Sequence, residues 1–363
     1  MKDFLEGLRP ELAELAAYVP AVPAGIRVRL DANEAPPLVS PAVREAVARA
    51  VASVSLARYP DARALELKEA IALRTGAAAT SLVVGSGSDE VIALLLTALA
   101  RPRGRMPQAT IIMPTPTFVM YRVTGRAHGL RIVEVPLDGG WDLDLAGMMK
   151  AVDVVHPNVV FIASPNNPTG NRMSEERLEA FASHASGALV VIDEAYVDYA
   201  GGASLSRMRE RHANVAVLRT LSKVGLAALR VGWIEAGDEI VSALDKVRQP
   251  FNLSATSQAA ALAVLRDAWD DVAAHVAFVV EERARVTREL VRARGVSVTP
   301  SAANFVWVRT EKPAETVHAA LVARGVLVRS FRGGGRMAQQ LRVTIGTREE
   351  NDAMLAALEE ACA

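Results

Sequence analysis

A single lysine in an unusual setting is the first feature of the sequence that suggests chemistry. Lys223 lies in the stretch VLRTLSKVGLAALRVGW (residues 217–233), where it follows an apolar run and precedes a glycine, and Arg230 comes seven residues later. A lysine that needs only contact with water requires no such setting. We therefore interpret Lys223 as a fixed amine, a group that can attack a carbonyl carbon and carry a proton.

Polar groups also follow three other apolar runs. The segment GSGSDE (85–90) follows SLVV, SPNNPTG (164–170) follows VVFIA, and DEAY (193–196) follows LVVI. Ligands of open α/β sheets bind beyond the carboxyl ends of the strands, so a site is expected at these positions. Each segment also has a purely structural explanation, namely a glycine-rich turn before a helix, a chain reversal, and a capping or ion-paired acid.

Together the four segments meet the requirements of one cofactor, pyridoxal 5'-phosphate (PLP). This cofactor needs a lysine that forms a Schiff base, an acid such as Asp193 that keeps the pyridine nitrogen protonated, and donors for its phosphate. The helix that begins near Ser88 offers N–H groups and a positive dipole end, while Ser222 and Arg230 add further donors. Dinucleotide binding is disfavoured, because Glu90 stands where the fingerprint requires glycine or alanine.

Composition excludes several other classes of protein. Lys and Arg number 41, as do Asp and Glu, so the net charge is zero and no long run of one sign predicts binding to nucleic acid or acidic lipid. The six histidines are scattered, and no metal site is expected. The longest clean apolar run, Val91–Ala100, is too short to span a membrane, and the N-terminal segment lacks a signal-peptide core. The only cysteine, Cys362, leaves no intrachain disulfide, so a cytoplasmic protein is expected.

The order of the expected strands and helices, which must position these groups, predicts an α/β fold. Between about residues 80 and 235, β-rich runs alternate with helical segments, which is typical of a mostly parallel sheet covered on both faces. Helices are expected at Asp89–Ala100, at Glu175–His184 and after Pro116. The expected strands are SLVV, TIIM, RIVEV, NVVFIA, ALVVID, NVAVL and VGWIEA.

The C-terminal part of the chain predicts a second, smaller unit. About 40 residues after Pro250 lack proline and internal glycine, which predicts long helix, in one or two pieces. Four short strands follow (VSVTP, NFVWVR, VLVRS and LRVTIGT), and Thr347 with Glu350 forms a capping box for a final helix. We expect a large PLP-binding domain at 45–255 and a small α+β domain made of 1–44 and 256–363.

Motifs along nearly the whole chain resemble those of fold-type I aminotransferases. SPNNPTG, DEAY, TLSK followed by LR, and LRVTIGT occur in the order and approximate spacing of that group. Four further segments narrow the resemblance to the histidinol-phosphate aminotransferase family: LDANEAPP (30–37), RYPD (58–61), GSGSDE (85–90) and PTFVMY (116–121). The resemblance implies the fold-type I architecture, with a large α/β domain on a mostly parallel sheet and a smaller α+β domain.

The resemblance also implies a role for each matching residue around PLP. Lys223 would hold the cofactor and carry the proton, Asp193 would pair with the pyridine nitrogen, and Phe118 would stack on the ring. Asn167 and Tyr196 would bond the 3′ oxygen of the ring. The implied catalytic residues are Lys223, Asp193 and Tyr196, and the implied cofactor-binding residues are Ser88, Asp89, Phe118, Asn167, Asp193, Tyr196, Ser222, Lys223, Arg230 and Tyr59. Tyr59 would serve the neighbouring subunit's cofactor, which implies a homodimer.

On the substrate side, the resemblance implies binding by Tyr18, Asn33, Glu34, Arg329 and Arg342. The two arginines at strand ends would bind the anionic end of the substrate, whereas Arg332 and Arg336 in the intervening loop are expected to be solvated. The sequence departs from the family pattern twice. Phe118 replaces a tyrosine of many relatives, and the loop between Lys223 and Arg230 is one residue shorter than in many of them.

The function implied is transfer of an amino group between L-histidinol phosphate and 2-oxoglutarate, by a ping-pong mechanism, to give imidazole-acetol phosphate and L-glutamate in histidine biosynthesis. An aromatic amino-acid aminotransferase is the nearest alternative, because it would use the same catalytic set. A decarboxylase of a phosphorylated amino acid is more distant. A non-catalytic PLP-binding regulatory protein is disfavoured, because Lys223, Asp193, Asn167, Tyr196 and Arg230 are all present.

Overall fold

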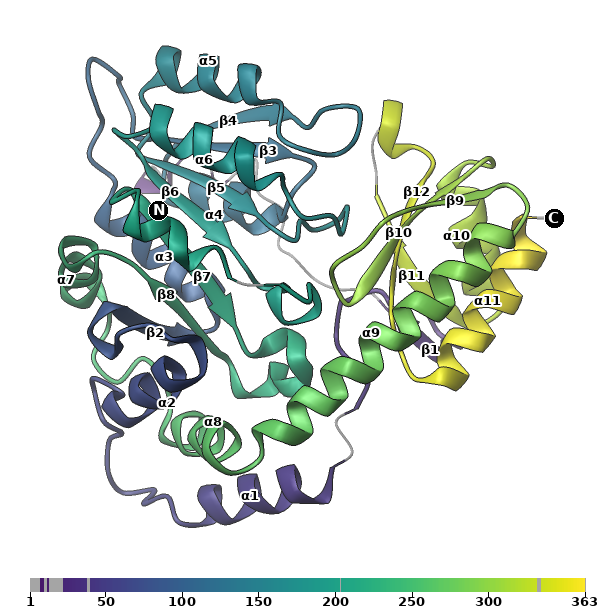
Figure 1. The fold of residues 1–363 in the computed structure, drawn as a ribbon, viewed down its shortest axis with the longest axis horizontal. Coiled ribbons are helices and arrows are strands. Elements are labelled where there is room, and N and C mark those ends of the chain that lie inside the picture. The colour runs from purple at the N-terminus through teal and green to yellow at the C-terminus, as the bar shows by residue number, and fades with distance from the viewer. Residues whose placement is uncertain are drawn as a thin grey trace, which may run out of the picture.

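The computed structural model describes residues 7–9, 12, 22–37, 40–202, 204–331 and 334–362. These residues form two units, one around a seven-stranded sheet and the other around a five-stranded sheet (Figure 1). The long helix α9 (Trp269–Arg292) runs from the larger unit to the smaller one. The site described below lies where the two units meet.

The larger sheet has the strand order β2-β8-β7-β6-β5-β3-β4. Its strands match the seven apolar runs expected from the sequence: β2 (Leu82–Ser86), β3 (Thr110–Thr115), β4 (Arg131–Pro136), β5 (Val159–Ala163), β6 (Leu189–Asp193), β7 (Val215–Thr220) and β8 (Val231–Glu235). The pairings among β3, β4, β5, β6 and β7 are parallel, and β8 runs antiparallel to β2 and β7. The mostly parallel sheet predicted from the sequence is confirmed.

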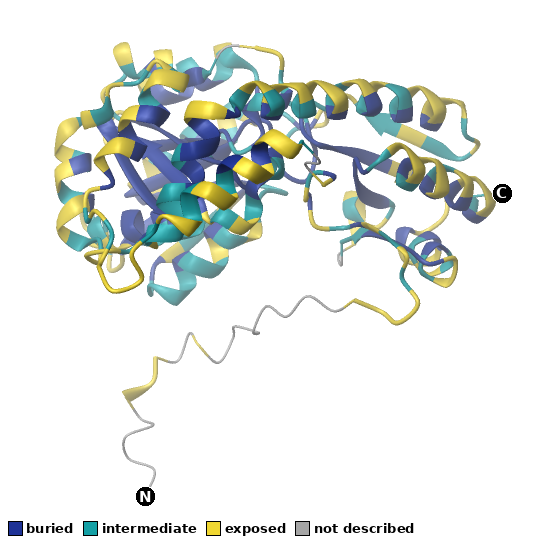
Figure 2. Cartoon of the chain, turned by 90° about the horizontal axis from the view of Figure 1, so that it is seen from below, coloured by how far each residue is buried: buried dark blue, intermediate teal, exposed yellow. Residues whose placement is uncertain are grey.

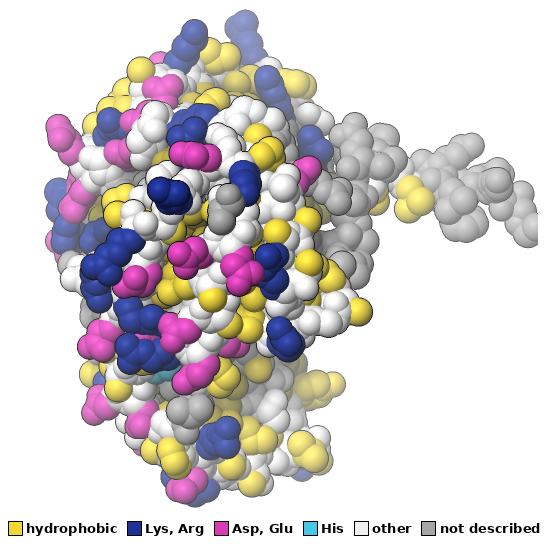
Figure 3. Space-filling view, turned by 90° about the vertical axis from the view of Figure 1, so that its right-hand side faces the viewer, with side chains coloured by type: hydrophobic (Ala, Val, Ile, Leu, Met, Phe, Trp, Pro, Cys, Tyr) yellow, Lys and Arg dark blue, Asp and Glu magenta, His cyan; other side chains and the backbone are white. Residues whose placement is uncertain are grey.

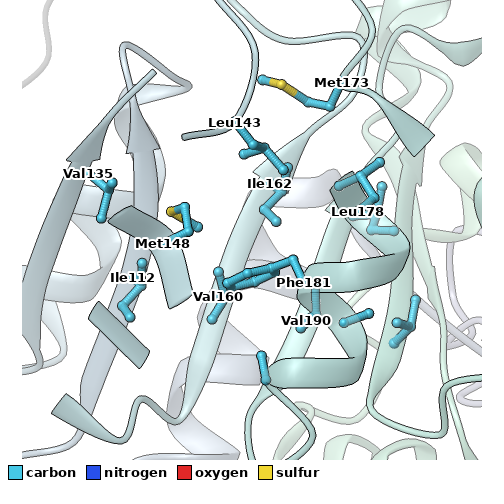
Figure 4. Packing of buried hydrophobic residues seen from close by; sticks show 14 of the residues in the cluster. Ile112, Val135, Leu143, Met148, Val160, Ile162, Met173, Leu178, Phe181 and Val190 are labelled. Atoms are coloured by element: carbon cyan, nitrogen blue, oxygen red, sulfur yellow. The ribbon is translucent and has the colours of Figure 1, made fainter. Parts of the chain in front are cut away.

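Helices cover both faces of this sheet, which explains its continuous apolar strands. On one face, Val160 and Ile162 of β5 pack with Met148 of α5 (Leu145–Val155) and Phe181 of α6 (Glu175–His184), as Figure 4 shows. On the other face, Phe161 packs among residues of α3 (Ser88–Ala98), α4 (Val119–Ala127) and α7 (Asp238–Val247). With both faces buried, polar side chains that serve a ligand are confined to the strand ends.

The smaller sheet has the order β1-β11-β12-β10-β9. It comprises β1 (Val28–Leu30), β9 (Val296–Thr299), β10 (Phe305–Thr310), β11 (Val326–Ser330) and β12 (Gln340–Thr344), with α10 (Ala314–Ala323) and α11 (Arg348–Cys362) packed against it. The capping box before α11 is confirmed, because the Thr347 N–H donates to Glu350 (2.8 Å) and the Glu350 N–H donates to Thr347 Oγ1 (3.3 Å). Since β1 pairs parallel with β11, the segment near residue 30 belongs to this sheet.

The helical run after Pro250 forms two helices, α8 (Ala255–Asp267) and α9, because the backbone leaves the helical region at Ala268 (φ −139°). Val272 packs in the same cluster as α1 (Pro41–Ala52), α2 (Leu65–Thr75) and β2 of the larger unit. Val279 and Leu290 pack in the core of the smaller unit, and the buried stripe along α9 is visible in Figure 2. We therefore propose a domain division within α9, C-terminal of the boundary suggested by the sequence.

The surface carries charges of both signs. On the face shown in Figure 3, lysine and arginine side chains are interspersed with aspartate and glutamate, in keeping with a net charge of zero. Among the residues that the structure describes, no helix is both long enough and apolar enough to cross a membrane.

Candidate active site

The ends of β5, β6 and β7 meet the first turn of α3 around a cavity of about 180 Å³. Nine of the ten residues that the sequence suggested for PLP line this cavity: Ser88, Asp89, Phe118, Asn167, Asp193, Tyr196, Ser222, Lys223 and Arg230. The tenth, Tyr59, lies elsewhere, with 81% of its surface exposed and its ring stacked on Phe251. The cavity at the strand ends therefore brings together residues that are up to 142 positions apart in the chain.

One end of the cavity is built to hold an anion. Gly87 has a positive φ (82°) that turns the chain into α3, so the N–H groups of Ser88 and Asp89 lie in the first helical turn. A Cβ at Gly232 would collide with the backbone of Gly87 and Ser88, so this close approach requires glycine. The Arg230 guanidinium donates to Ser222 Oγ (3.4 Å) beside this turn. Backbone donors, a hydroxyl and a guanidinium together suit a phosphate group.

Asp193 also lines the cavity and is buried, with 4% of its surface exposed. The Tyr121 hydroxyl donates to its Oδ2 (2.5 Å), and the N–H of Ala195 donates to its Oδ1 (2.9 Å). Burial raises the pKa of Asp193 to about 6, because the charged carboxylate loses its contact with water. An ionised carboxylate at this position is therefore best stabilised by a cation placed in the cavity.

Tyr121 is a site residue that the sequence did not reveal. It is fully buried, its ring stacks on Phe161 (4.7 Å between ring centres) and it meets Phe118 edge to face. Its motif PTFVMY was recognised, but nothing in the sequence indicated that the last residue of the motif points at the acid of DEAY. Burial raises the pKa of the Tyr121 hydroxyl well above its usual range, so this group remains a hydrogen-bond donor.

The backbone around Lys223 is irregular and is held by a second tyrosine. Lys223 lies in the short π-helical turn Ser222–Leu226, which Gly225 breaks with a φ of 90°. The buried hydroxyl of Tyr199 donates to the main-chain oxygen of Lys223 (2.6 Å). Arg283 of α9 donates to the main-chain oxygen of Tyr199 (3.1 Å). The lysine amine lies 5.9 Å from the centre of the Tyr196 ring. No sequence pattern indicated this role of Tyr199.

A larger cleft of about 620 Å³ opens from this cavity between the two units. Arg329 on β11 and Arg342 on β12 line it and are directly paired in the sheet register. Arg342 is buried and donates to Asn167 Oδ1 (2.6 Å) and to the main-chain oxygen of Asp31 (2.6 Å). One of the expected substrate arginines therefore contacts an expected cofactor residue directly.

The other expected substrate-binding residues have different positions. Asn33 is buried, and its Nδ2 donates to the Tyr196 hydroxyl (2.8 Å) while its N–H donates to Thr344 Oγ1 (3.0 Å). Glu34 is exposed and lines both the cavity and the cleft. Tyr18 and Arg332 lie outside the described residues.

Arg336 is exposed, as expected for a solvated residue, but it also contacts the larger unit. Its guanidinium donates to three main-chain oxygens of the larger unit, those of Leu137 (3.3 Å), Asp138 (2.7 Å) and Gly139 (3.0 Å). It also lies 3.6 Å from the centre of the Trp141 ring. The expectation of a solvated arginine agrees with the exposure of Arg336. Its contacts were not predicted, because the loop of the other unit offers carbonyl groups that sequence patterns do not reveal.

The residues of the cavity fit PLP. The first turn of α3, Ser222 and Arg230 offer donors for the phosphate. Asp193 offers a buried carboxylate for a pyridinium, Phe118 offers an aromatic face, and Lys223 offers an amine. One cavity therefore offers donors for a phosphate and a carboxylate for a ring nitrogen, as a ring with a phosphate arm requires.

Comparison with known proteins points in the same direction. The sequence model of the family "Aminotransferase class I and II" matches residues 26–358. A histidinol-phosphate aminotransferase 2 of Nitrosococcus oceani is 40% identical over 97% of this chain and 96% of its own length, and a histidinol-phosphate aminotransferase of Aquifex aeolicus is 39% identical over 96% of each chain. The crystal structure of histidinol-phosphate aminotransferase from Sinorhizobium meliloti in complex with pyridoxal-5'-phosphate superposes with a TM-score of 0.85 at 27% identity, covering 98% of this chain and 97% of that one.

Proposed function

This chain belongs to the class I and II aminotransferases, and from that premise we propose that it transfers the amino group of L-histidinol phosphate to 2-oxoglutarate, in histidine biosynthesis. It is a PLP-dependent enzyme. The proposal is supported by relatives of that name that are 39–40% identical over nearly the full chain. The products are imidazole-acetol phosphate and L-glutamate.

Some residues of the cavity act in proton transfer, and others bind the cofactor. Bound PLP supplies an electron-withdrawing ring, which makes the hydrogen on the substrate's α-carbon acidic. The Lys223 amine takes this proton on Nζ and returns it. Asp193 provides the negative charge that keeps a pyridine nitrogen protonated, and Tyr121 keeps this carboxylate oriented.

The remaining cavity residues hold and orient the cofactor. Asn167 and Tyr196 would bind the ring oxygen, and Ser222 and Arg230 would bind the phosphate beside the first turn of α3, since all four line the cavity. Phe118 keeps an aromatic surface against the ring, and its lack of a hydroxyl leaves stacking as its contribution.

The pair of arginines in the cleft is the observation that supports L-histidinol phosphate as the substrate. L-histidinol phosphate has a phosphate and no carboxylate, whereas glutamate has carboxylates, so one cationic site must accept both anions in turn. Arg329 and Arg342 lie side by side on β11 and β12, next to the lysine cavity. A guanidinium binds either anion in a bidentate manner, and its five N–H donors allow structural hydrogen bonds and anion binding at the same time.

A transamination assay tests this proposal. The purified holoenzyme is given L-histidinol phosphate, phenylalanine and tyrosine side by side, with 2-oxoglutarate as acceptor, and glutamate is measured. We expect the highest kcat/KM for L-histidinol phosphate. A higher kcat/KM for the aromatic amino acids would instead establish the alternative aromatic aminotransferase. No turnover with any donor, together with bound PLP, would favour the regulatory protein.

We also propose that the enzyme is a homodimer with shared active sites. Tyr59 is 81% exposed and lies with Leu56 (93%), Leu73 (83%) and Phe251 (40%) among the exposed apolar side chains of the larger unit. A second copy of the chain would bury such a surface, and Tyr59 would then reach the partner's phosphate site.

Mixing two inactive or weakened variants tests this arrangement. In a heterodimer of Tyr59→Phe and Lys223→Ala chains, one shared site carries both defects and the other carries neither. We expect activity to recover after the chains are mixed and exchanged. If activity only averages between the two variants, Tyr59 does not serve a partner's site. The single cysteine and the metabolic role support a cytoplasmic location, which cell fractionation would test.

A further inference from the structure

Arg336 joins the two units close to the substrate cleft. It lies in the short helical turn Gly335–Met337 between β11 and β12, and it donates to the carbonyls of Leu137, Asp138 and Gly139 in the loop that follows β4. Figure 1 shows this loop extending toward the segment between β11 and β12. The guanidinium lies 3.6 Å from the centre of the Trp141 ring, within range of a cation–π interaction. We call this contact the Arg336–Trp141 clasp.

The loop that receives Arg336 is itself fixed. The N–H groups of Gly140 and Asp142 both donate to Asp138 Oδ1 (2.9 Å each), and Arg177 of α6 donates to Asp138 Oδ2 (2.6 Å). Trp141 has a φ of 66°, a left-handed conformation that is costly for a bulky side chain. Such a conformation persists where the surroundings over-determine it, and here Asn171 also binds the Trp141 carbonyl (2.9 Å). The loop therefore offers Arg336 a rigid attachment.

A chain of ring contacts leads from the clasp to the substrate arginine. Trp141 meets Trp307 edge to face (6.1 Å between ring centres), and Trp307 meets Phe331 in the same way (5.1 Å). Phe331 lines the cleft, and the Arg342 guanidinium lies 5.9 Å from the centre of its ring. Trp307 is also the register partner of Arg342 across β10 and β12. Each contact in this chain joins side chains that have little room to move independently.

We propose that the Arg336–Trp141 clasp is a positioning device for the anionic end of the substrate. It fixes the connection between β11 and β12 against the larger unit, so that Arg329 and Arg342 stand at the right distance from Lys223. The proposal rests on the function proposed above for the cleft. It assigns to Arg336 no contact with the substrate. Loss of the clasp shifts the two guanidinium groups but leaves the bond from Arg342 to Asn167 intact. It therefore lowers the affinity for donors with an anionic group at the far end and leaves the chemistry at Lys223 unchanged.

The test uses the holoenzyme and the variant Arg336→Ala. We expect its KM for L-histidinol phosphate and for L-glutamate to rise about three- to tenfold, while kcat and the KM for phenylalanine change less than about twofold. Arg336→Lys keeps a cation near the ring and should recover part of the loss. The matched control is Arg309→Ala on β10, whose side chain bonds Gln339 of its own unit (3.1 Å) and should leave each KM unchanged.

A spectroscopic measurement tests the contact without reference to any substrate. Arg336→Ala should change the tryptophan emission, and the same substitution in a Trp141→Phe background should leave the remaining emission unchanged. Equal changes in KM for all three donors, an unchanged KM for glutamate, or the same effect from Arg309→Ala would each overturn the clasp. If the wild-type enzyme does not use L-histidinol phosphate, the proposed function fails, and the clasp is still decided by glutamate and by the emission spectra.

Discussion

The proposed cofactor half and the proposed substrate half of the candidate site are built by different means. The cofactor half takes its groups from the ends of neighbouring strands in one sheet, with Asn167 after β5, Asp193 at the end of β6 and Lys223 after β7. The substrate half takes Arg329 and Arg342 from the other sheet and connects them to the first half through contacts such as Arg342 to Asn167. The first half is thus assembled by strand order, and the second by packing between units.

Because of this difference, we expect the two halves to respond differently to substitutions. In a parallel sheet, consecutive strand ends meet at one edge whatever the details of packing, so the cofactor half depends mainly on residue identity. The substrate half depends on distances between two units, so residues that never touch a ligand affect it. We expect substitutions in the cofactor half to act on kcat, and substitutions in the substrate half to act on KM and on the choice of donor.

The largest effect is expected at the centre of the cofactor half. Lys223→Ala removes the amine that carries the proton and should lower kcat by about 10⁴-fold or more. PLP should still bind through Asp193, Ser222 and Arg230, so the loss is one of chemistry. Steady-state assays and a PLP titration measure the two quantities separately. Near-normal transamination without an added amine would contradict the assignment of Lys223.

Asp193→Asn should give the next largest effect, again on the rate of the chemical step. A neutral amide cannot hold a pyridine nitrogen protonated, so we expect proton removal from the substrate to slow by about 10²- to 10³-fold. Binding of PLP in the ground state should suffer less. Single-turnover measurements with glutamate report the step directly, and equal rates for the variant and the wild type would count against this role.

The same substitution should have the opposite effect on the stability of the apoprotein. Burial raises the pKa of Asp193 from 3.8 to about 6, so the folded protein holds this proton more tightly than the unfolded chain does. The charged carboxylate therefore lowers stability progressively as the pH rises from about 4 to about 6, and the full penalty remains above that range. Asp193→Asn should stabilise the apoprotein at pH 7.5 by up to about 3 kcal/mol, and less at pH 5. Thermal unfolding at both pH values checks this, and a less stable variant at pH 7.5 would refute it.

The substrate half should respond with changes in donor choice. Losing a charge-assisted contact costs about 1.5–3 kcal/mol, or about one to two decades in kcat/KM. Arg329→Ala should reduce activity with L-histidinol phosphate more than with phenylalanine, whose side chain is neutral. Arg342→Ala should impair every donor, because Arg342 also holds Asn167 of the cofactor half. An unchanged ratio of L-histidinol phosphate to phenylalanine activity in Arg329→Ala would remove the anion-binding role and favour the aromatic aminotransferase.

The smallest effect is expected at Tyr199, which joins the core of the smaller unit to the main chain at Lys223. Tyr199→Phe removes only the hydroxyl that bonds the Lys223 carbonyl and keeps the ring in the core of the smaller unit. We expect kcat to fall about three- to tenfold and the free energy of unfolding to fall by about 1 kcal/mol. Kinetics and thermal unfolding measure both. An unchanged kcat with reduced stability would mean that the bond matters for folding alone.

The cofactor half could be located from the sequence because its signals are local. The motifs SPNNPTG, DEAY and TLSK each follow a buried strand, and the strands themselves are unmistakable apolar runs. Four of the five strands of the smaller unit were also evident, all except β1, as was the capping box at Thr347. What these features share is that neighbouring residues in the chain determine them.

Contacts between residues that are far apart in the chain could not be predicted in the same way. Tyr121 reaches Asp193 from a helix 72 residues earlier, and Arg336 reaches the loop at Asp138 from 198 residues away. These pairs depend on helix orientation and on how the two sheets face each other, which no local pattern encodes. The same cause explains why Tyr199 was not identified and why the contacts of Arg336 with the larger unit were not predicted.

The most direct test of the central claim is to identify the residue that carries the cofactor. The purified protein is loaded with PLP, reduced with borohydride so that the cofactor is fixed to its amine, digested and analysed by mass spectrometry. We predict that the label lies on Lys223, and that L-glutamate added before reduction prevents the labelling by converting the cofactor to its amine form. A label on another lysine, or labelling of Lys223 that glutamate does not affect, would contradict an aminotransferase site at the ends of β5, β6 and β7.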